Sequence, residues 1–233
     1  MREDIYTLYS FAVCGDTEAI IEYGDALLYT CPDRVSELEA EELVWMYNEA
    51  IKKHSPEAMI GLGVLYDMGT FTRHSDIMAR KLYNMAYEYA EDNQLIVKAS
   101  SLLLANVLET GTEEMVEEAK RKAYSAWMYG VEHVLASLLT GDMQRKDGQY
   151  HNAYESYIVA KDLVYKNKEN RRFLGDVLLR YAEIYDFGIH AKRDKEKAEK
   201  YYTEAERILK KQAEHKNGFA VRALKRMEED RRV

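Results

Sequence analysis

The chain repeats a sequence pattern at a fixed distance. Residues 62–69 (LGVLYDMG) return as residues 181–188 (YAEIYDFG), an offset of 119 positions (188 − 69). An internal repeat of this kind is typical of stacked helical hairpins, in which neighbouring copies bury each other's apolar faces, and not of one closed globular core. The same offset relates three further pairs: Ala79 and Ala198, Tyr83 and Tyr202, and Ala86 and Ala205.

A spacing of small and aromatic residues marks one helical face in most units. Two alanines lie seven positions apart, with a tyrosine three positions before the second, as in Ala79, Tyr83 and Ala86. These spacings put the side chains on one side of a helix, where small residues let a neighbouring helix approach closely. The last alanine of each set stands at position 50, 86, 126, 160 or 205, and these steps suit two-helix repeats.

The sequence therefore predicts an all-α, right-handed superhelical solenoid of about five helix-turn-helix units in a single continuous domain, 1–233. The predicted units cover approximately 16–54, 55–92, 95–130, 132–168 and 171–212, and an amphipathic capping helix follows at 217–231. Helix-start and helix-end residues support these bounds. The starts are Asp16, Ser55 before Pro56, Ser75 and Thr112, and the ends are Gly69, Gly111 and Gly188.

Composition favours helical structure and limits the cell compartments and classes of partner that we expect. Only two prolines occur, and two cysteines, Cys14 and Cys31, predict free thiols in a reducing compartment. We see neither a basic-then-apolar leader nor a run of about 18 uncharged apolar residues, so we expect a cytoplasmic protein without a membrane partner. The net charge of −8 would repel phosphates, so we expect no nucleic acid.

The charge is unevenly distributed along the chain. Residues 192–233 hold 14 Lys and Arg against 9 Asp and Glu, so the rest of the chain is strongly acidic. The basic end is either a solvated terminal helix or a contact for an anionic partner or the acidic body of a second copy.

The pattern resembles the Sel-like repeats, a branch of the tetratricopeptide-like helical solenoids. The residues that carry the resemblance form two sets, Ala58, Leu62, Gly63, Tyr66, Gly69, Asp76, Ala79, Tyr83 and Ala86, and Ala182, Tyr185, Gly188, Asp194, Ala198, Tyr202 and Ala205. The unit around Gly141 is more similar to an ordinary tetratricopeptide repeat. The resemblance implies a protein–protein adaptor, in a family whose partners are diverse.

First helices of successive hairpins line the concave side of such an array, so their outward positions predict the binding surface. These positions are mostly acidic: Asp25, Asp67, Asn106, Glu109, Asp142, Arg145, Glu183 and Asp186. They form either an ordinary solvated face or an anionic groove that selects a basic or amide-rich peptide.

No motif indicates catalysis, a metal or a cofactor. None of the six histidines forms an H-E-x-x-H pair or lies at zinc-ligand spacing from a cysteine, and there is no phosphate-binding glycine loop or nucleophile elbow. We therefore predict a non-catalytic scaffold that binds a protein or peptide in its concave groove. The alternatives are an inhibitor or immunity-type protein that occludes one target, and a self-assembling structural protein.

Overall fold

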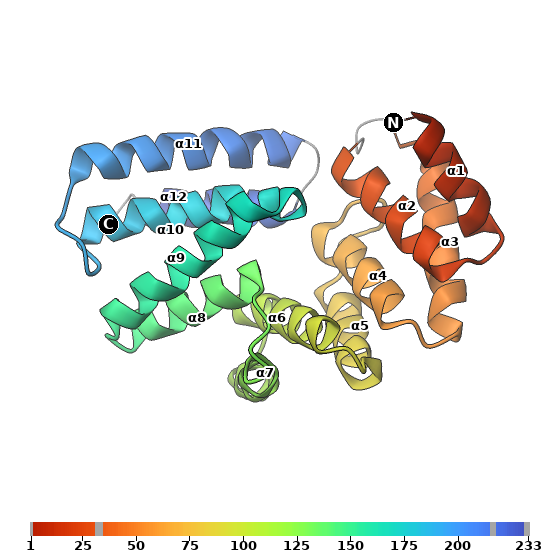
Figure 1. The fold of residues 1–233 in the computed structure, drawn as a ribbon, viewed down its shortest axis with the longest axis horizontal. Helices are drawn as coiled ribbons and strands as arrows, with labels where there is room; N and C mark the ends of the chain where they lie inside the picture. The colour runs from red at the N-terminus through yellow and green to blue at the C-terminus, as the bar shows by residue number, and fades with distance from the viewer. Residues whose placement is uncertain (1, 31–34, 215–217, 231–233) are drawn as a thin grey trace. The chain divides into compact units, whose positions relative to one another are not determined.

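The computed structural model describes residues 2–30, 35–214 and 218–230, and these residues form helices and connecting turns without any β-strand (Figure 1). Contacts between residues divide the chain into two compact units, residues 1–129 and 130–233. Within the described residues, no helix is both long and apolar enough to cross a membrane. Cys31, one of the two predicted free thiols, lies outside the described residues, and Cys14 is exposed.

Unit 1 (1–129) consists of a leading helix and three helical hairpins. The leading helix is α1 (Arg2–Val13), which packs on α2 and precedes the first predicted repeat. The hairpins are α2 (Thr17–Thr30) with α3 (Glu37–Lys52), α4 (Pro56–Met68) with α5 (Asp76–Tyr89), and α6 (Asn93–Thr110) with α7 (Glu113–Trp127).

Unit 2 (130–233) consists of two hairpins and a terminal helix. The hairpins are α8 (Val134–Lys146) with α9 (Tyr150–Lys166), and α10 (Leu174–Phe187) with α11 (Lys195–Glu214); a 3-10 helix, η2 (Lys168–Phe173), connects them. Helix α12 (Gly218–Asp230) then packs against α11, and Ala220, Ala223 and Met227 bury its apolar side. The all-α class, with five hairpins and a terminal helix, is confirmed. The single continuous domain over residues 1–233 stays a prediction.

The packing of small residues under tyrosine rings holds the hairpins together. Tyr83 of α5 lies so close to Gly63 of α4 that a Cβ atom there would stand 2.7 Å from its ring, and Tyr157 of α9 covers Gly141 of α8 in the same way at 2.5 Å. Tyr47 of α3 contacts glycines of both α2 and α4. All three tyrosines are fully buried, so the predicted small–aromatic spacing marks the packing face between helices.

The two copies related by 119 positions share the same loop backbone. The amide of Ser75 donates to the carbonyl of Tyr66 at 3.0 Å, and the amide of Asp194 donates to the carbonyl of Tyr185 at 2.9 Å. Each first helix ends on a glycine with positive φ, at Gly69 and Gly188, as predicted. Gly111, in contrast, ends α6 in an extended conformation.

Candidate functional site

The predicted binding residues lie on the first helices of all five hairpins, α2, α4, α6, α8 and α10, and we call them the first-helix row. Their exposure differs widely. Asp25 and Glu109 are exposed, and Asp142, Arg145 and Asp186 are half-buried. The other three are nearly inaccessible, with exposed fractions of 1% for Asp67, 3% for Asn106 and 4% for Glu183. As they lie, these three side chains face the protein interior.

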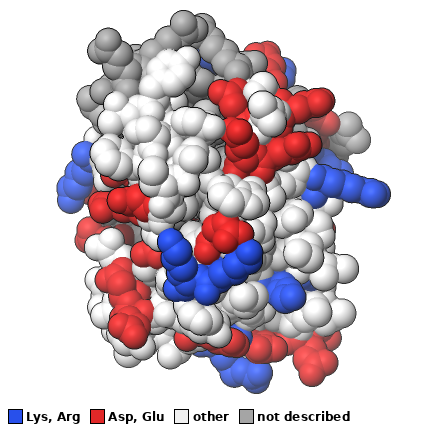
Figure 2. Space-filling view, turned by 90° about the vertical axis from the view of Figure 1, so that its right-hand side faces the viewer, with Lys and Arg blue, Asp and Glu red and all other residues white. Residues whose placement is uncertain are grey.

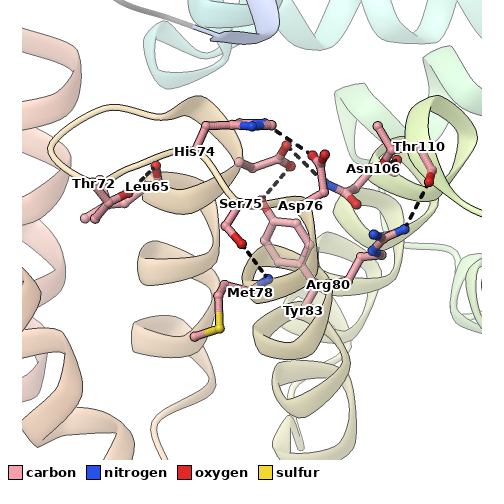
Figure 3. A network of polar contacts seen from close by, with 11 residues as sticks. Leu65, Thr72, His74, Ser75, Asp76, Met78, Arg80, Tyr83, Asn106 and Thr110 are labelled. Carbon is pink, nitrogen blue, oxygen red and sulfur yellow. Dashed lines mark hydrogen bonds and ion pairs between the residues drawn. The ribbon is translucent and has the colours of Figure 1, made fainter.

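The buried members of the first-helix row in unit 1 belong to a polar cluster at the end of the second hairpin where α4 leads into α5. We call it the Asp67 cluster, and it consists of Asp67, His74, Asp76, Tyr83 and Asn106. The Tyr83 hydroxyl donates to Asp67 Oδ2 at 3.1 Å, from the far end of the ring that packs on Gly63. The Asn106 carboxamide donates from Nδ2 to Asp67 Oδ1 at 3.1 Å and to Asp76 Oδ1 at 3.3 Å. The amide of α6 therefore joins two carboxylates of the preceding hairpin (Figure 3).

The loop between α4 and α5 positions the remaining members of the Asp67 cluster. The Thr72 hydroxyl donates to the carbonyl of Leu65 at 2.9 Å, and the Ser75 side chain caps α5 by accepting from the amide of Met78 at 3.3 Å. His74 is thereby held beside the first turn of α5, with its Nε2 atom 3.2 Å from Asp76 Oδ1 (Figure 3).

The buried members of unit 2 belong to a second polar cluster, between α8, α9 and α10. We call it the Asp142 cluster, and it consists of Asp142, Arg145, Tyr157, Arg180 and Glu183. Arg180 makes a two-pronged contact with Asp142, from Nε to Oδ1 at 3.1 Å and from Nη2 to Oδ2 at 2.6 Å. The Tyr157 hydroxyl donates to Asp142 at 2.8 Å, and Arg145 pairs with Glu183.

These contacts shift the pKa values of the Asp142 cluster in opposite directions. Burial by itself would raise the pKa of Asp142, but the charge and hydrogen bonds of Arg180 outweigh it and leave the pKa below its ordinary value. Burial disfavours the charged form of Arg180, yet the carboxylates of Asp142 and Glu183 hold its pKa well above the usual range. Burial and the charge of Asp142 raise the pKa of Tyr157. Asp142 and Arg180 are therefore ionised and paired at neutral pH, and the Tyr157 hydroxyl keeps its proton.

The accessible part of the row is a set of carboxylates beside exposed apolar side chains. Asp186 pairs loosely with Arg193 at 3.7 Å, and both are open to solvent. Large apolar groups such as Phe187 at the end of α10 and Leu108 on α6 are also exposed. Figure 2 shows one side of the molecule, on which acidic and basic groups, several of them adjacent, are interspersed with uncharged surface. On α3, Leu38 and Trp45 are exposed.

Sequence reasoning missed Arg180, which pairs with Asp142, and the meeting of Asp67 with His74 and Asp76. A signal was present in the spacing. Asp142 and Arg180 are 38 positions apart, Arg145 and Glu183 are also 38 apart, and Asp67 and Asn106 are 39 apart. This separation is about one repeat, so complementary polar residues one repeat apart on first helices predict contacts between adjacent hairpins.

Comparison with known protein families finds a match for two of the hairpins. The Sel1 repeat model matches residues 56–88 and 176–207, which are the α4–α5 hairpin and most of α10 and α11. A solved structure of a Sel1 repeat protein from Oxalobacter formigenes is similar over 88% of this chain and 78% of its own, with 19% identity and a TM-score of 0.57.

A second solved structure is c5321, described as a protective antigen of uropathogenic Escherichia coli strains displaying an SLR fold. It aligns over 93% of this chain and 50% of its own, with 18% identity and a TM-score of 0.44. No curated protein sequence matches the chain.

Proposed function

This chain is a Sel-like repeat protein, and we propose that it is a non-catalytic scaffold that binds a protein or peptide partner along its first-helix row. Sel1 repeat proteins generally mediate protein–protein interactions. The observation that carries the proposal for this chain is the repetition itself. The three hairpins of unit 1 and the two hairpins of unit 2 each present a first helix, so within each unit equivalent positions recur and can contact successive parts of a partner.

The chemistry of the accessible row favours a basic partner segment. Asp25, Glu109 and Asp186 are the row members that bring carboxylates to the surface, on α2, α6 and α10. Lys or Arg side chains of a partner would find opposite charge there, and such pairs set orientation and the rate of encounter more than total affinity. The buried members, Asp67 and Glu183, would support the surface from below rather than touch the partner.

The test uses the accessible carboxylates of the row, because a change at Glu183 would break its ion pair with Arg145 and confound binding with folding. The binding variant is D25K/E109K/D186K. Its matched control is E41K/E88K/E199K, which makes the same charge change at exposed sites on the second helices α3, α5 and α11. Circular dichroism checks that both variants keep their helix content.

Two measurements follow. Wild-type protein selects from a displayed random-peptide library, and we expect the selected peptides to be rich in Lys and Arg. Their affinity should fall about tenfold or more, that is about 1.4 kcal/mol, in the binding variant and hold in the control. A selection without basic enrichment, or an equal loss in both variants, would contradict a binding role for this row.

Affinity capture from native lysate at two salt concentrations addresses the alternatives. A single stoichiometric partner would favour an inhibitor that occludes one target, and several partners would favour a general scaffold. Self-association that weakens steeply with salt would favour the structural protein.

A further inference from the structure

We propose that the Asp67 cluster binds one divalent transition-metal ion, through carboxylate oxygens of Asp67 and Asp76, His74 Nε2 and the carboxamide oxygen of Asn106. Ligand atoms of Asp67, His74 and Asp76 all lie within 4.8 Å of one another. They come from the end of α4, the loop that follows it and the first turn of α5, and Asn106 approaches from α6 (Figure 3).

The distances within the cluster suit a shared ion. Ligands about 2.1 Å from a zinc-type ion in a tetrahedron stand about 3.4 Å from one another. His74 Nε2 is 3.2 Å from Asp76 Oδ1, and the Asn106 carboxamide is 3.1 Å from Asp67 and 3.3 Å from Asp76. The side chains would need only small movements to surround an ion.

Asn106 supplies an independent sign of a missing ligand. Its side chain is almost fully buried and its Nδ2 atom donates to both carboxylates, while its Oδ1 atom, on the other side of the carboxamide, has no hydrogen-bond partner. A buried carbonyl oxygen without a partner is costly. Rotating the carboxamide by half a turn would place Oδ1 between the carboxylates of Asp67 and Asp76. Three oxygens so close together repel one another unless a cation or a shared proton lies between them, and a cation would satisfy all three.

The ligand set favours a particular class of ion. Carboxylate and amide oxygens suit Mg²⁺, Ca²⁺ and Mn²⁺, whereas imidazole favours Zn²⁺ and related transition ions. One imidazole with three oxygens therefore selects Zn²⁺ or Mn²⁺ over Mg²⁺ and Ca²⁺. An ion can reach the site from solvent, since the side chain of His74 is 48% exposed and that of Asp76 is 25% exposed.

The related copy in unit 2 has its own cations at these positions. The 119-residue offset carries Asp67 onto Asp186, His74 onto Arg193 and Asp76 onto Lys195. Arg193 lies 3.7 Å from Asp186, so a side-chain cation takes the place that we assign to the metal ion. The copy in unit 1 combines two acids with a histidine instead, which is the composition of a metal site.

The test is titration calorimetry on the full chain after treatment with a chelator, using ZnCl₂ and MnCl₂, with MgCl₂ and CaCl₂ for comparison. We expect one Zn²⁺ or Mn²⁺ per chain, and affinity at least about tenfold lower in His74→Ala and Asp76→Asn. The matched control is His190→Ala. It removes an exposed loop histidine whose ring nitrogen lies 3.1 Å from that of His151, a pair that could itself take up zinc.

Any of three outcomes would overturn the proposal: neither Zn²⁺ nor Mn²⁺ binds, both variants bind the ion as tightly as the wild type, or His190→Ala alone abolishes binding. A readout on the wild-type protein avoids any dependence on folding of the variants. In NMR spectra, substoichiometric Mn²⁺ should broaden the His74 ring signals first. Broadening that begins at His151 and His190 would place the ion elsewhere and count against the site.

Asn106→Asp separates a ligand from a mere hydrogen-bond donor. As a ligand, the new carboxylate binds the ion at least as tightly as the amide does. The metal-free variant then melts below the wild type, and added Zn²⁺ or Mn²⁺ raises its melting temperature more than it raises that of the wild type. If Asn106 only donates to the two carboxylates, the variant is destabilised to the same degree with and without the ion.

Discussion

The Asp67 cluster of unit 1 and the Asp142 cluster of unit 2 are two versions of one arrangement. In each, a tyrosine from the second helix packs its ring on a first-helix glycine and donates its hydroxyl to a first-helix aspartate. The groups around that aspartate differ. Asp142 lies against the guanidinium of Arg180, whereas Asp67 receives neutral donors and lies near the imidazole of His74.

The two hairpins share the glycine–tyrosine contact but differ in the groups that bind the buried aspartate. The contact, and not a particular partner of the aspartate, therefore characterises the hairpin. A carboxylate removed from water needs hydrogen bonds or an opposite charge. Unit 2 supplies that charge with Arg180, whereas in unit 1 Tyr83 and Asn106 donate hydrogen bonds to Asp67. The same backbone therefore carries a closed ion-pair network in one unit and a candidate ion site in the other.

The largest effect should come from removing the cation that pairs with Asp142 in unit 2. Arg180→Met leaves the carboxylate of Asp142 without its paired cation, and we expect a loss of about 3–5 kcal/mol in the free energy of unfolding, measured by urea denaturation. Asn106→Leu in unit 1 removes only neutral donors and should cost about 1–3 kcal/mol. The double variant D142N/R180M should recover part of the first loss. Equal losses of unfolding free energy in Arg180→Met and Asn106→Leu would show that the two clusters do not differ in how they stabilise the buried aspartate.

An intermediate effect tests what the clusters share. Gly63→Ala and Gly141→Ala each place a methyl group against a fully buried tyrosine ring, at 2.7 and 2.5 Å. Overpacking of this kind should destabilise both variants by about 1–3 kcal/mol in thermal or urea unfolding. Helix propensity alone predicts the opposite sign, since alanine is favoured over glycine by about 1 kcal/mol in a helix. A gain in stability at either site would show that the ring moves aside.

The smallest effect concerns pH. Because the pKa of Asp142 is lowered in the folded state, its contribution is complete above the unfolded pKa of about 3.9 and is lost as the pH falls through the folded value. The stability difference between wild type and Asp142→Asn, followed by urea unfolding from about pH 7 to about pH 3, should therefore shrink at the acid end. Asp147→Asn, at an exposed turn after α8, is the control. A constant difference across the range would mean that Asp142 is not paired as described.

Local features of the fold were predictable because they depend on residues close in sequence. Ser55 with Pro56, Ser75 and Thr112 begin helices as expected, and Gly69 ends one, because caps and left-handed turns involve only a few neighbours. The small–aromatic spacing identified the buried face for the same reason.

The polar clusters were not predictable in this way. Whether Asp67 and Glu183 face solvent or a neighbour depends on how one hairpin rests on the next, and helical periodicity does not contain that information. Their burial turns attention to Asp25, Glu109 and Asp186 as the accessible carboxylates of the row. The partner-binding role of the row itself stays a prediction.

The loops between the paired helices carry one further consequence. Phe71 and His190 occupy corresponding positions, and both adopt a positive φ, 63° and 54°, which side chains other than glycine rarely accept. Two unlike residues accept the same unfavourable conformation because the loop closes on itself through its own amides. The shared backbone predicts that the loop sequence of one copy can replace that of the other while the chain keeps its path from one helix to the next.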